Sequence, residues 1–193
     1  MERIGEFLPF MLEGSVTTVQ VFVLTLVLSL PLGLPIALGS NSRFKPLSFL
    51  CKIYVWIFRG TPLMLQLWFF YFFFPFNFGI VLDAMATAVL TYVLNYAAYF
   101  AEIYRGGINS IDRGQYEAAH ALGLSKKQTM FDIILPQTMK AILPPVVNEA
   151  ITLVKDTALV SALAVIDLMK ATNSAVNRTT SLTPFFYAAI IYL

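Results

Sequence analysis

From residue 117 to residue 136 the chain carries the stretch EAAHALGLSKKQTMFDIILP. This stretch lies within a polar segment, about residues 108–136, that interrupts long apolar sequences on both sides. A charged segment between apolar spans is where a membrane protein meets a cytoplasmic partner. The stretch therefore predicts a contact surface inside an otherwise membrane-embedded protein.

The composition of the chain agrees with membrane embedding. Of its 193 residues, 58% are hydrophobic and 12% are charged, whereas soluble domains carry about 25% charged residues. So few charges leave too little polar surface for a globule in water, and we predict a multi-pass membrane protein with one domain, residues 1–193. The net charge of +2 is small and indicates no binding of nucleic acid.

The apolar sequence divides into segments of membrane-spanning length. A bilayer crossing needs about 20 apolar residues, and we expect spans at about residues 15–39, 61–74, 83–104 and 142–166, with the start of a fifth at 184–193. The last ten residues would reach only about 15 Å as a helix, so we expect that this fifth span is truncated.

Basic residues set the predicted orientation of these spans. The segment 40–59 holds four cations and no acidic residue, and short cationic loops favour the cytoplasmic side. The amino terminus is therefore predicted outside, and the polar segment 108–136 in the cytoplasm. Within the basic segment, Pro46 to Phe58 is expected to form an amphipathic helix near the inner surface.

Two short helices are predicted in the polar segment. The first runs from about Arg113 to Leu122, with Gly123 as its stop. The second opens at Ser125, where Gln128 three residues later completes a capping box. This second helix is expected to end near Pro136, because proline lacks the N–H that a helix interior needs.

Polar side chains inside the third predicted span suggest a pathway for a solute. Asn95, Tyr99 and Glu102 are spaced four and three residues apart and so share one helix face. Asn95 is equally compatible with a bridge between helices. For Glu102, a local ion pair with Arg105 one turn later is the stronger expectation.

The fourth predicted span carries a second polar face. Glu149, Thr152 and Asp156 are spaced three and four residues apart. Charges at bilayer depth are costly and usually face a cavity or a partner, so Glu149 is the candidate to pair with a substrate ammonium or guanidinium. Asp156 has the alternative of neutralising its neighbour Lys155.

Several further stretches join the first one in resembling a known family. They are Arg59-Gly60-Thr61-Pro62-Leu63-(two residues)-Gln66, Ala98-Tyr99-(two residues)-Glu102-Ile103-(one residue)-Arg105-Gly106-Gly107-Ile108, Gly114-Gln115, Leu135-Pro136-Gln137 and Asn148-Glu149-(one residue)-Ile151-(three residues)-Lys155-Asp156. Together they cover about residues 59–161. This pattern resembles the permease subunits of polar amino-acid ATP-binding-cassette (ABC) importers of bacteria, the family of the EAA loop (histidine, glutamine and arginine type).

The resemblance implies an all-α integral membrane fold, a type I ABC importer permease-like core of about five transmembrane helices. It also implies site residues. The ATPase-coupling residues would be Gln115, Glu117, Ala118, Ala119 and Gly123. The substrate pathway would be lined by Asn95, Tyr99, Glu149, Gln66 and Thr152, and the resemblance supports Asn95 and Glu149 most.

The resemblance further implies that the chain is not an enzyme. The sequence contains no Gly-x-x-x-x-Gly-Lys-Ser/Thr phosphate loop, so ATP hydrolysis is expected in a separate ABC ATPase, present as two copies. The other expected partners are a second permease copy, identical or related, an extracytoplasmic amino-acid-binding protein and membrane lipid, with no cofactor and no metal. The alternative left open is an ion-coupled secondary transporter of small polar solutes.

Overall fold

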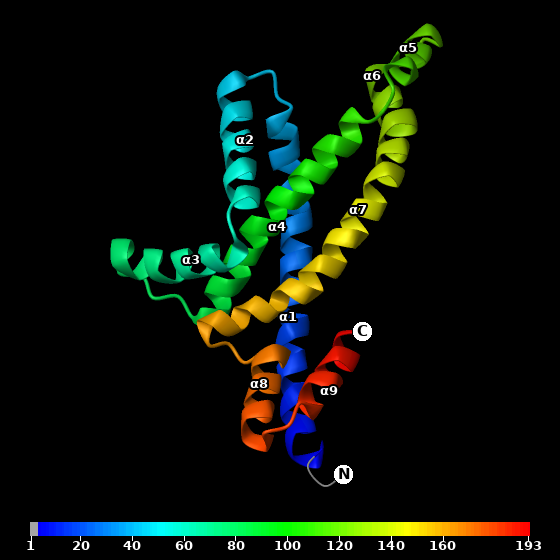
Figure 1. Ribbon diagram of the computed structural model, residues 1–193. Helices are drawn as coiled ribbons and strands as arrows, with labels where there is room; N and C mark the ends of the chain where they lie inside the picture. Colours follow the sequence, from blue (N-terminus) through cyan, green and yellow to red (C-terminus); the bar gives the residue numbers. More distant parts are fainter. Residues whose placement is uncertain (1–3) are drawn as a thin grey trace. The chain divides into compact units, whose positions relative to one another are not determined.

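The structure is a computed structural model that describes residues 4–193, and in that range it contains helices and no strand (Figure 1). The predicted all-helical fold is confirmed for these residues. The predicted outside position of the amino terminus concerns residues 1–3, which lie outside the described range. The helices are α1 (Ile4–Ser40), α2 (Lys45–Gly60), α3 (Leu63–Phe78), α4 (Ala84–Asn109), α5 (Arg113–Ala121), α6 (Lys126–Gln128), η1 (Thr129–Ile134), α7 (Leu135–Asp156), η2 (Thr157–Leu163), α8 (Leu168–Thr179) and α9 (Thr183–Tyr192).

Helix α1 buries small side chains and exposes large apolar ones. Its buried positions recur every three or four residues: Met11, Gly14, Thr18, Val21, Thr25, Ser29, Gly33 and Ala37. Val16, Val19 and Val27 on its other faces are 57%, 57% and 60% exposed. Lipid tails solvate such side chains as well as a protein core does, whereas small residues let membrane helices approach closely. The pattern is that of a membrane helix.

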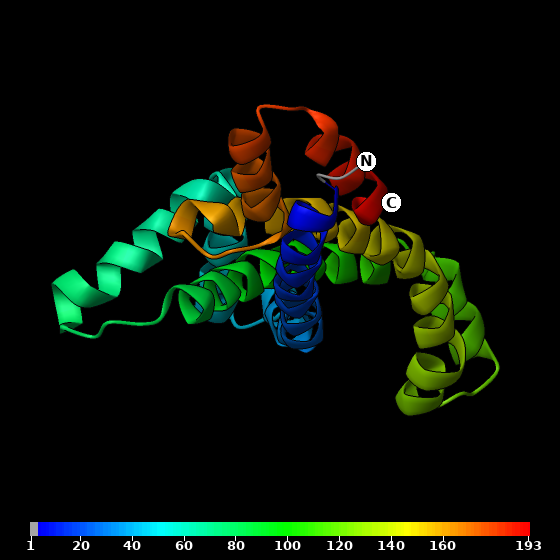
Figure 2. The same ribbon diagram turned by 90° about the horizontal axis from the view of Figure 1, so that it is seen from below.

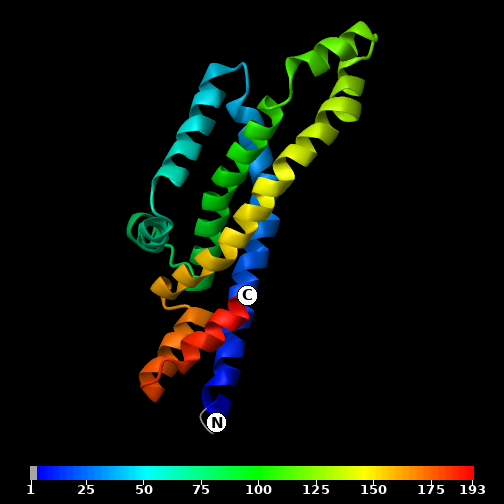
Figure 3. The same ribbon diagram turned by 45° about the vertical axis from the view of Figure 1, so that its right-hand side comes forward.

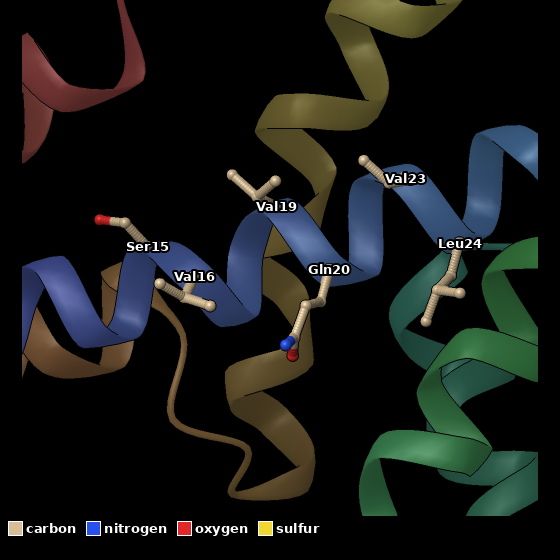
Figure 4. A pocket seen from close by; sticks show the side chains of 6 residues that line it. All are labelled: Ser15, Val16, Val19, Gln20, Val23 and Leu24. Carbon is tan, nitrogen blue, oxygen red and sulfur yellow. The ribbon is translucent and has the colours of Figure 1, made fainter.

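A shallow depression of about 610 Å³ follows the exposed side of α1. Its lining is Ser15, Val16, Val19, Gln20, Val23 and Leu24 (Figure 4). In this close-up Val19 and Val23 point to one side of the helix and Gln20 to the other. Four of these six side chains are aliphatic, so this surface of α1 suits hydrocarbon.

Among the described residues, two helices are long and apolar enough to cross a membrane by themselves, Phe7–Ser40 and Ala84–Asn109. The pair of α2 and α3, counted together as one broken span, is a third candidate. The predicted helix at residues 46–58 is confirmed by α2, and its packing shows which helices it contacts. Its Val55 shares a buried cluster with Ala37 of α1 and with Ala98 and Ala101 of α4, so α2 packs against two spans.

Contacts divide the chain into two compact units, each assembled from separate segments. The first comprises residues 1–28, 60–95 and 151–193, and the second comprises residues 29–59 and 96–150. In the first unit, α8 and α9 pack beside the start of α1 (Figures 2 and 3). Their shared core is Phe7, Met11, Leu168, Ala171, Ala175 and Ala188.

A buried carboxylate fixes the start of α8 in the first unit. Asp167 has no exposed surface, and its side chain accepts hydrogen bonds from the backbone N–H groups of Lys170 at 2.9 Å and Met169 at 3.1 Å. Burial raises the pKa of Asp167, and these backbone hydrogen bonds oppose that shift. The cap explains why the helix α8 begins within the polar segment 167–183.

Two predicted helix ends differ from the structure. Helix α4 continues through Arg105-Gly106-Gly107 to Asn109. The second helix of the polar segment does not end at Pro136. It passes through the π-helical turn Thr129–Ile134 into α7, of which Pro136 is the second residue. A π turn shifts the hydrogen-bond register by one residue, and the missing N–H of proline falls at that junction.

Gly33 allows α1 and α4 to approach closely in the second unit. A Cβ added at Gly33 would lie 2.9 Å from the Cβ of Phe100, 3.1 Å from the Ala101 nitrogen and 3.2 Å from the Ala97 oxygen. We expect Gly33→Ala to destabilise the purified protein by about 1–3 kcal/mol, the usual cost of overpacking. The measurement is thermal unfolding in detergent.

Gly106→Ala is the matched control for this substitution. Gly106 is also helical, and a Cβ added there meets nothing within 4 Å. Both changes gain the same helix propensity, about 0.5–1 kcal/mol, so only steric contact separates them. Equal melting temperatures for the two variants would show that the close approach of α1 and α4 does not limit stability.

Candidate functional site

The polar segment forms a helical hairpin whose ends are capped by its own side chains. The carboxylate of Asp112 accepts a hydrogen bond of 2.6 Å from the Gly114 N–H at the start of α5. At the next start, the Ser125 hydroxyl accepts from the Gln128 N–H at 3.3 Å while the Gln128 side chain accepts from the Ser125 N–H at 3.0 Å. The predicted capping box and the predicted first helix are therefore confirmed.

Gly123 makes the turn between these helices. It adopts a left-handed conformation with φ of 71°, which costs residues with a side chain about 1–2 kcal/mol. A Cβ at this position would meet nothing within 4 Å. The turn therefore requires glycine for its backbone conformation, while its surroundings in this chain are open.

Helix α5 packs on one side and leaves the other exposed. Ala119 is 1% exposed, and the Gln115 Oε1 accepts a hydrogen bond of 3.0 Å from the Gln137 Nε2 of α7. Glu117 and Ala118 are exposed, and Leu122 beside Gly123 is 78% exposed. Four of the five predicted coupling residues are thus accessible to a partner. The fifth, Ala119, lies on the buried side of α5.

Gln66 and Asn95, 29 positions apart in sequence, meet in the first unit. The Asn95 Nδ2 donates to the Gln66 Oε1 at 2.9 Å. The Gln66 Nε2 in turn donates to the hydroxyl and the carbonyl oxygen of Thr61, at 2.7 and 3.1 Å. Gln66 and Asn95 are 7% and 4% exposed. Two predicted pathway residues, Gln66 and Asn95, are therefore linked by a buried hydrogen bond between their side-chain amides.

Thr61 has a different role from the predicted one. The sequence suggests that its hydroxyl caps the following helix, but α3 begins at Leu63 with Pro62 as its cap and with no side-chain cap hydrogen bond. The hydroxyl receives the Gln66 side chain instead. Sequence analysis missed this partner because Thr61-Pro62 is also a typical helix start.

Tyr99 and Glu102 each meet an arginine in the second unit. The guanidinium carbon of Arg59 lies 5.2 Å from the centroid of the Tyr99 ring, a cation–π contact. Glu102 forms an ion pair with Arg105, which donates from both Nε and Nη2. The expected local pairing of Glu102 is confirmed, which leaves Tyr99 as the partly exposed polar residue of that helix face.

Glu149 and Thr152 lie one turn apart on α7. Glu149 is half-buried in the second unit, and Thr152 is exposed in the first. The predicted pathway residues are thus distributed over both compact units, Gln66, Asn95 and Thr152 in one and Tyr99 and Glu149 in the other. In the part of the chain that the structure describes, no three His, Cys, Asp or Glu side chains form a group that could hold a metal ion.

Residues 29–193 match the family of inner membrane components of binding-protein-dependent transport systems. The chain belongs to this family. It is a permease subunit of an ABC transport system, it is located in the membrane, and members of the family work with ATPase and substrate-binding partners. This membership supports ATP-driven transport and does not support the ion-coupled alternative.

Known bacterial permeases are similar over nearly the whole chain. The arginine transport system permease protein ArtQ of Bacillus subtilis is 42% identical over 186 residues, which cover 96% of this chain and 85% of ArtQ. The putative glutamine transport system permease protein GlnP of Rickettsia felis is 38% identical, covering 95% of this chain and 84% of GlnP. The L-cystine transport system permease protein TcyB of Bacillus subtilis is 36% identical.

Solved structures confirm the type I permease fold. A chain from the crystal structure of an amino acid ABC transporter with histidines has a TM-score of 0.90 and 34% identity, over 98% of this chain and 88% of that chain. A chain of the inward-facing MetNI methionine ABC transporter has a TM-score of 0.63 at 18% identity, and that likeness concerns the fold alone.

Proposed function

We propose that this permease carries polar amino acids into the cell, driven by a separate ATPase. The observation that carries the proposal is the exposed EAA hairpin on a membrane-embedded helical chain. Relatives at 36–42% identity are named for transport of arginine, glutamine and cystine, which supports an amino acid as the cargo.

The EAA hairpin is the proposed docking element for the ATPase. Three of its residues are exposed. Glu117 presents a carboxylate and Leu122 an apolar side chain, and the small side chain of Ala118 lets a partner approach the backbone closely. The second arm of the hairpin continues without a break from η1 into α7. A displacement of the hairpin by the ATPase therefore passes through a continuous helical backbone into a predicted membrane span and changes access to the pathway.

The proposed assembly contains two permease chains, two ATPase subunits and one extracytoplasmic binding protein. Residues 1–193 form one permease domain in it, with the amino terminus outside and the hairpin, about residues 108–136, in the cytoplasm. The basic residues Arg43, Lys45 and Lys52 of segment 40–59 support this orientation.

The proposed substrate pathway uses Gln66, Asn95, Tyr99, Glu149 and Thr152. Amides such as Gln66 and Asn95 both donate and accept hydrogen bonds, which suits the zwitterionic part of an amino acid. Glu149 supplies a negative charge for an ammonium or a guanidinium. Half-burial of Glu149 supports this role, because a charged group at bilayer depth needs an aqueous or charged partner.

Uptake by proteoliposomes tests the proposed function. The liposomes would hold the permease, its ATPase and its binding protein, with a panel of labelled L-amino acids and with or without ATP. We expect ATP-dependent uptake of one polar amino acid or of a small group of them. Uptake that ignores ATP would contradict the proposal, and so would ATP-dependent uptake of solutes other than amino acids.

A further inference from the structure

Arg59 is a cation in the membrane region that the proposed pathway leaves without a role. It is exposed, and it belongs to the last turn of α2. Tyr99, the residue it contacts, lies in α4, five residues before residue 104, where the predicted span ends. Five helical residues measure about 7.5 Å, a quarter of a hydrocarbon core of about 30 Å. The contact therefore places the guanidinium of Arg59 within the predicted span and not at its end.

The groups that hold Arg59 in place carry no formal charge. One is the face of the Tyr99 ring, at 5.2 Å. The other is the carboxyl end of α2, whose helix dipole favours a cation. Both groups position the guanidinium. Neither accepts a hydrogen bond from its N–H groups, which form a planar fork of donors.

Glu102, an acidic residue that senses the charge of Arg59, is already paired with another arginine. The Glu102 oxygens accept hydrogen bonds from Nε and Nη2 of Arg105, and Arg59 acts on Glu102 through its charge alone. Glu102 and Arg105 form an ion pair with each other. Arg59 thus presents a free positive fork at a depth where lipid cannot solvate it, which is typical of a group facing a substrate path.

We propose that Arg59 binds the α-carboxylate of the transported amino acid, held for that purpose on the ring of Tyr99. A planar guanidinium matches a carboxylate in two parallel hydrogen bonds, and such charge-assisted bonds are among the strongest in proteins. Every amino acid carries this carboxylate, so Arg59 selects the class while other residues select the side chain. The inference rests on the proposed function.

A competition experiment on the assembled transporter tests the role of Arg59. The complex would be held in nanodiscs without its binding protein, so that only the permease selects the ligand. The probes are the twenty L-amino acids and the α-amide of each, which lacks the carboxylate charge. We expect the wild type to bind its amino acid at least about 30-fold more tightly than the amide, the effect of losing one partner of a desolvated charge pair.

In Arg59→Gln we expect this preference to fall to about threefold or less. A neutral glutamine side chain binds the α-amide probe nearly as well as it binds the α-carboxylate of the amino acid. Arg59→Lys, which keeps the charge and loses the fork, should retain an intermediate preference. Lys52→Gln is the matched control, since it removes another exposed cation of α2 and should leave the preference unchanged.

The outcomes separate this inference from the proposed function. Arg59→Gln with an undiminished preference for the carboxylate would overturn the inference and leave amino-acid transport standing, as expected if Arg59 instead binds a lipid phosphate. A wild-type complex that binds and transports no amino acid would overturn the proposed function together with the inference. Retained ATPase binding by each variant shows that the variant is folded.

Discussion

Gly123→Asp should abolish ATP-dependent uptake while the permease still inserts into the membrane. Gly123 lies in the exposed turn of the EAA hairpin, and its Cβ would meet no other atom of this chain. The cost within the permease is therefore limited to the left-handed backbone, about 1–2 kcal/mol. The larger cost falls on the docked complex, where the new carboxylate would be desolvated beside Leu122 and the ATPase surface.

We expect the ATPase to bind Gly123→Asp at least about tenfold more weakly, a loss typical of an interface residue that costs more than 1.4 kcal/mol. The measurements are co-purification of the ATPase and uptake in proteoliposomes. The amount of permease in the membrane fraction reports insertion.

Gly79→Asp is the matched control for this experiment. Gly79 also has a left-handed backbone, with φ of 65°, and open surroundings, but it follows α3 at the opposite end of the predicted spans. The same substitution there carries the same backbone strain and should keep uptake. Loss of uptake in both variants, or in neither, would contradict the coupling role of the hairpin.

Asn95→Leu should lower uptake strongly and also destabilise the permease. Leucine has a similar volume but removes the donor to the Gln66 Oε1. Loss of a buried hydrogen bond costs about 1–3 kcal/mol, which should lower the melting temperature of the purified protein. If Asn95 also contacts substrate, KM should rise by about tenfold, the effect of one lost hydrogen bond of that strength.

A double substitution separates the packing role of Asn95 from its pathway role. In Asn95→Leu with Gln66→Met both partners of this bond become apolar, and replacing both partners of a buried hydrogen bond is often nearly neutral for stability. Gln66→Met also removes the bonds to Thr61, which is only half-buried. We therefore expect the double variant to regain part of its thermal stability and to remain poor in uptake. Recovery of uptake together with stability would show that Asn95 serves only as a bridge between helices.

Local features of this protein followed from the sequence because short-range chemistry decides them. The capping box of Ser125 and Gln128, the glycine stop at Gly123 and the ion pair of Glu102 with Arg105 each involve residues within four positions of one another. Such contacts depend on helix geometry alone. The predicted membrane class was equally accessible, since it depends on the summed hydrophobicity of long segments.

Contacts between distant segments were decided only by the tertiary structure. Nothing in the local pattern indicates that Gln66 bonds Asn95, that Arg59 stacks on Tyr99, or that Val55 brings α2 against Ala37. Each depends on which helices pack together and on their relative rotation, and apolar segments of a membrane protein are too similar in sequence to specify a neighbour. The same holds at Pro136. The sequence pattern predicts a helix end there, but the structure has a π turn just before it and the helix continues into α7.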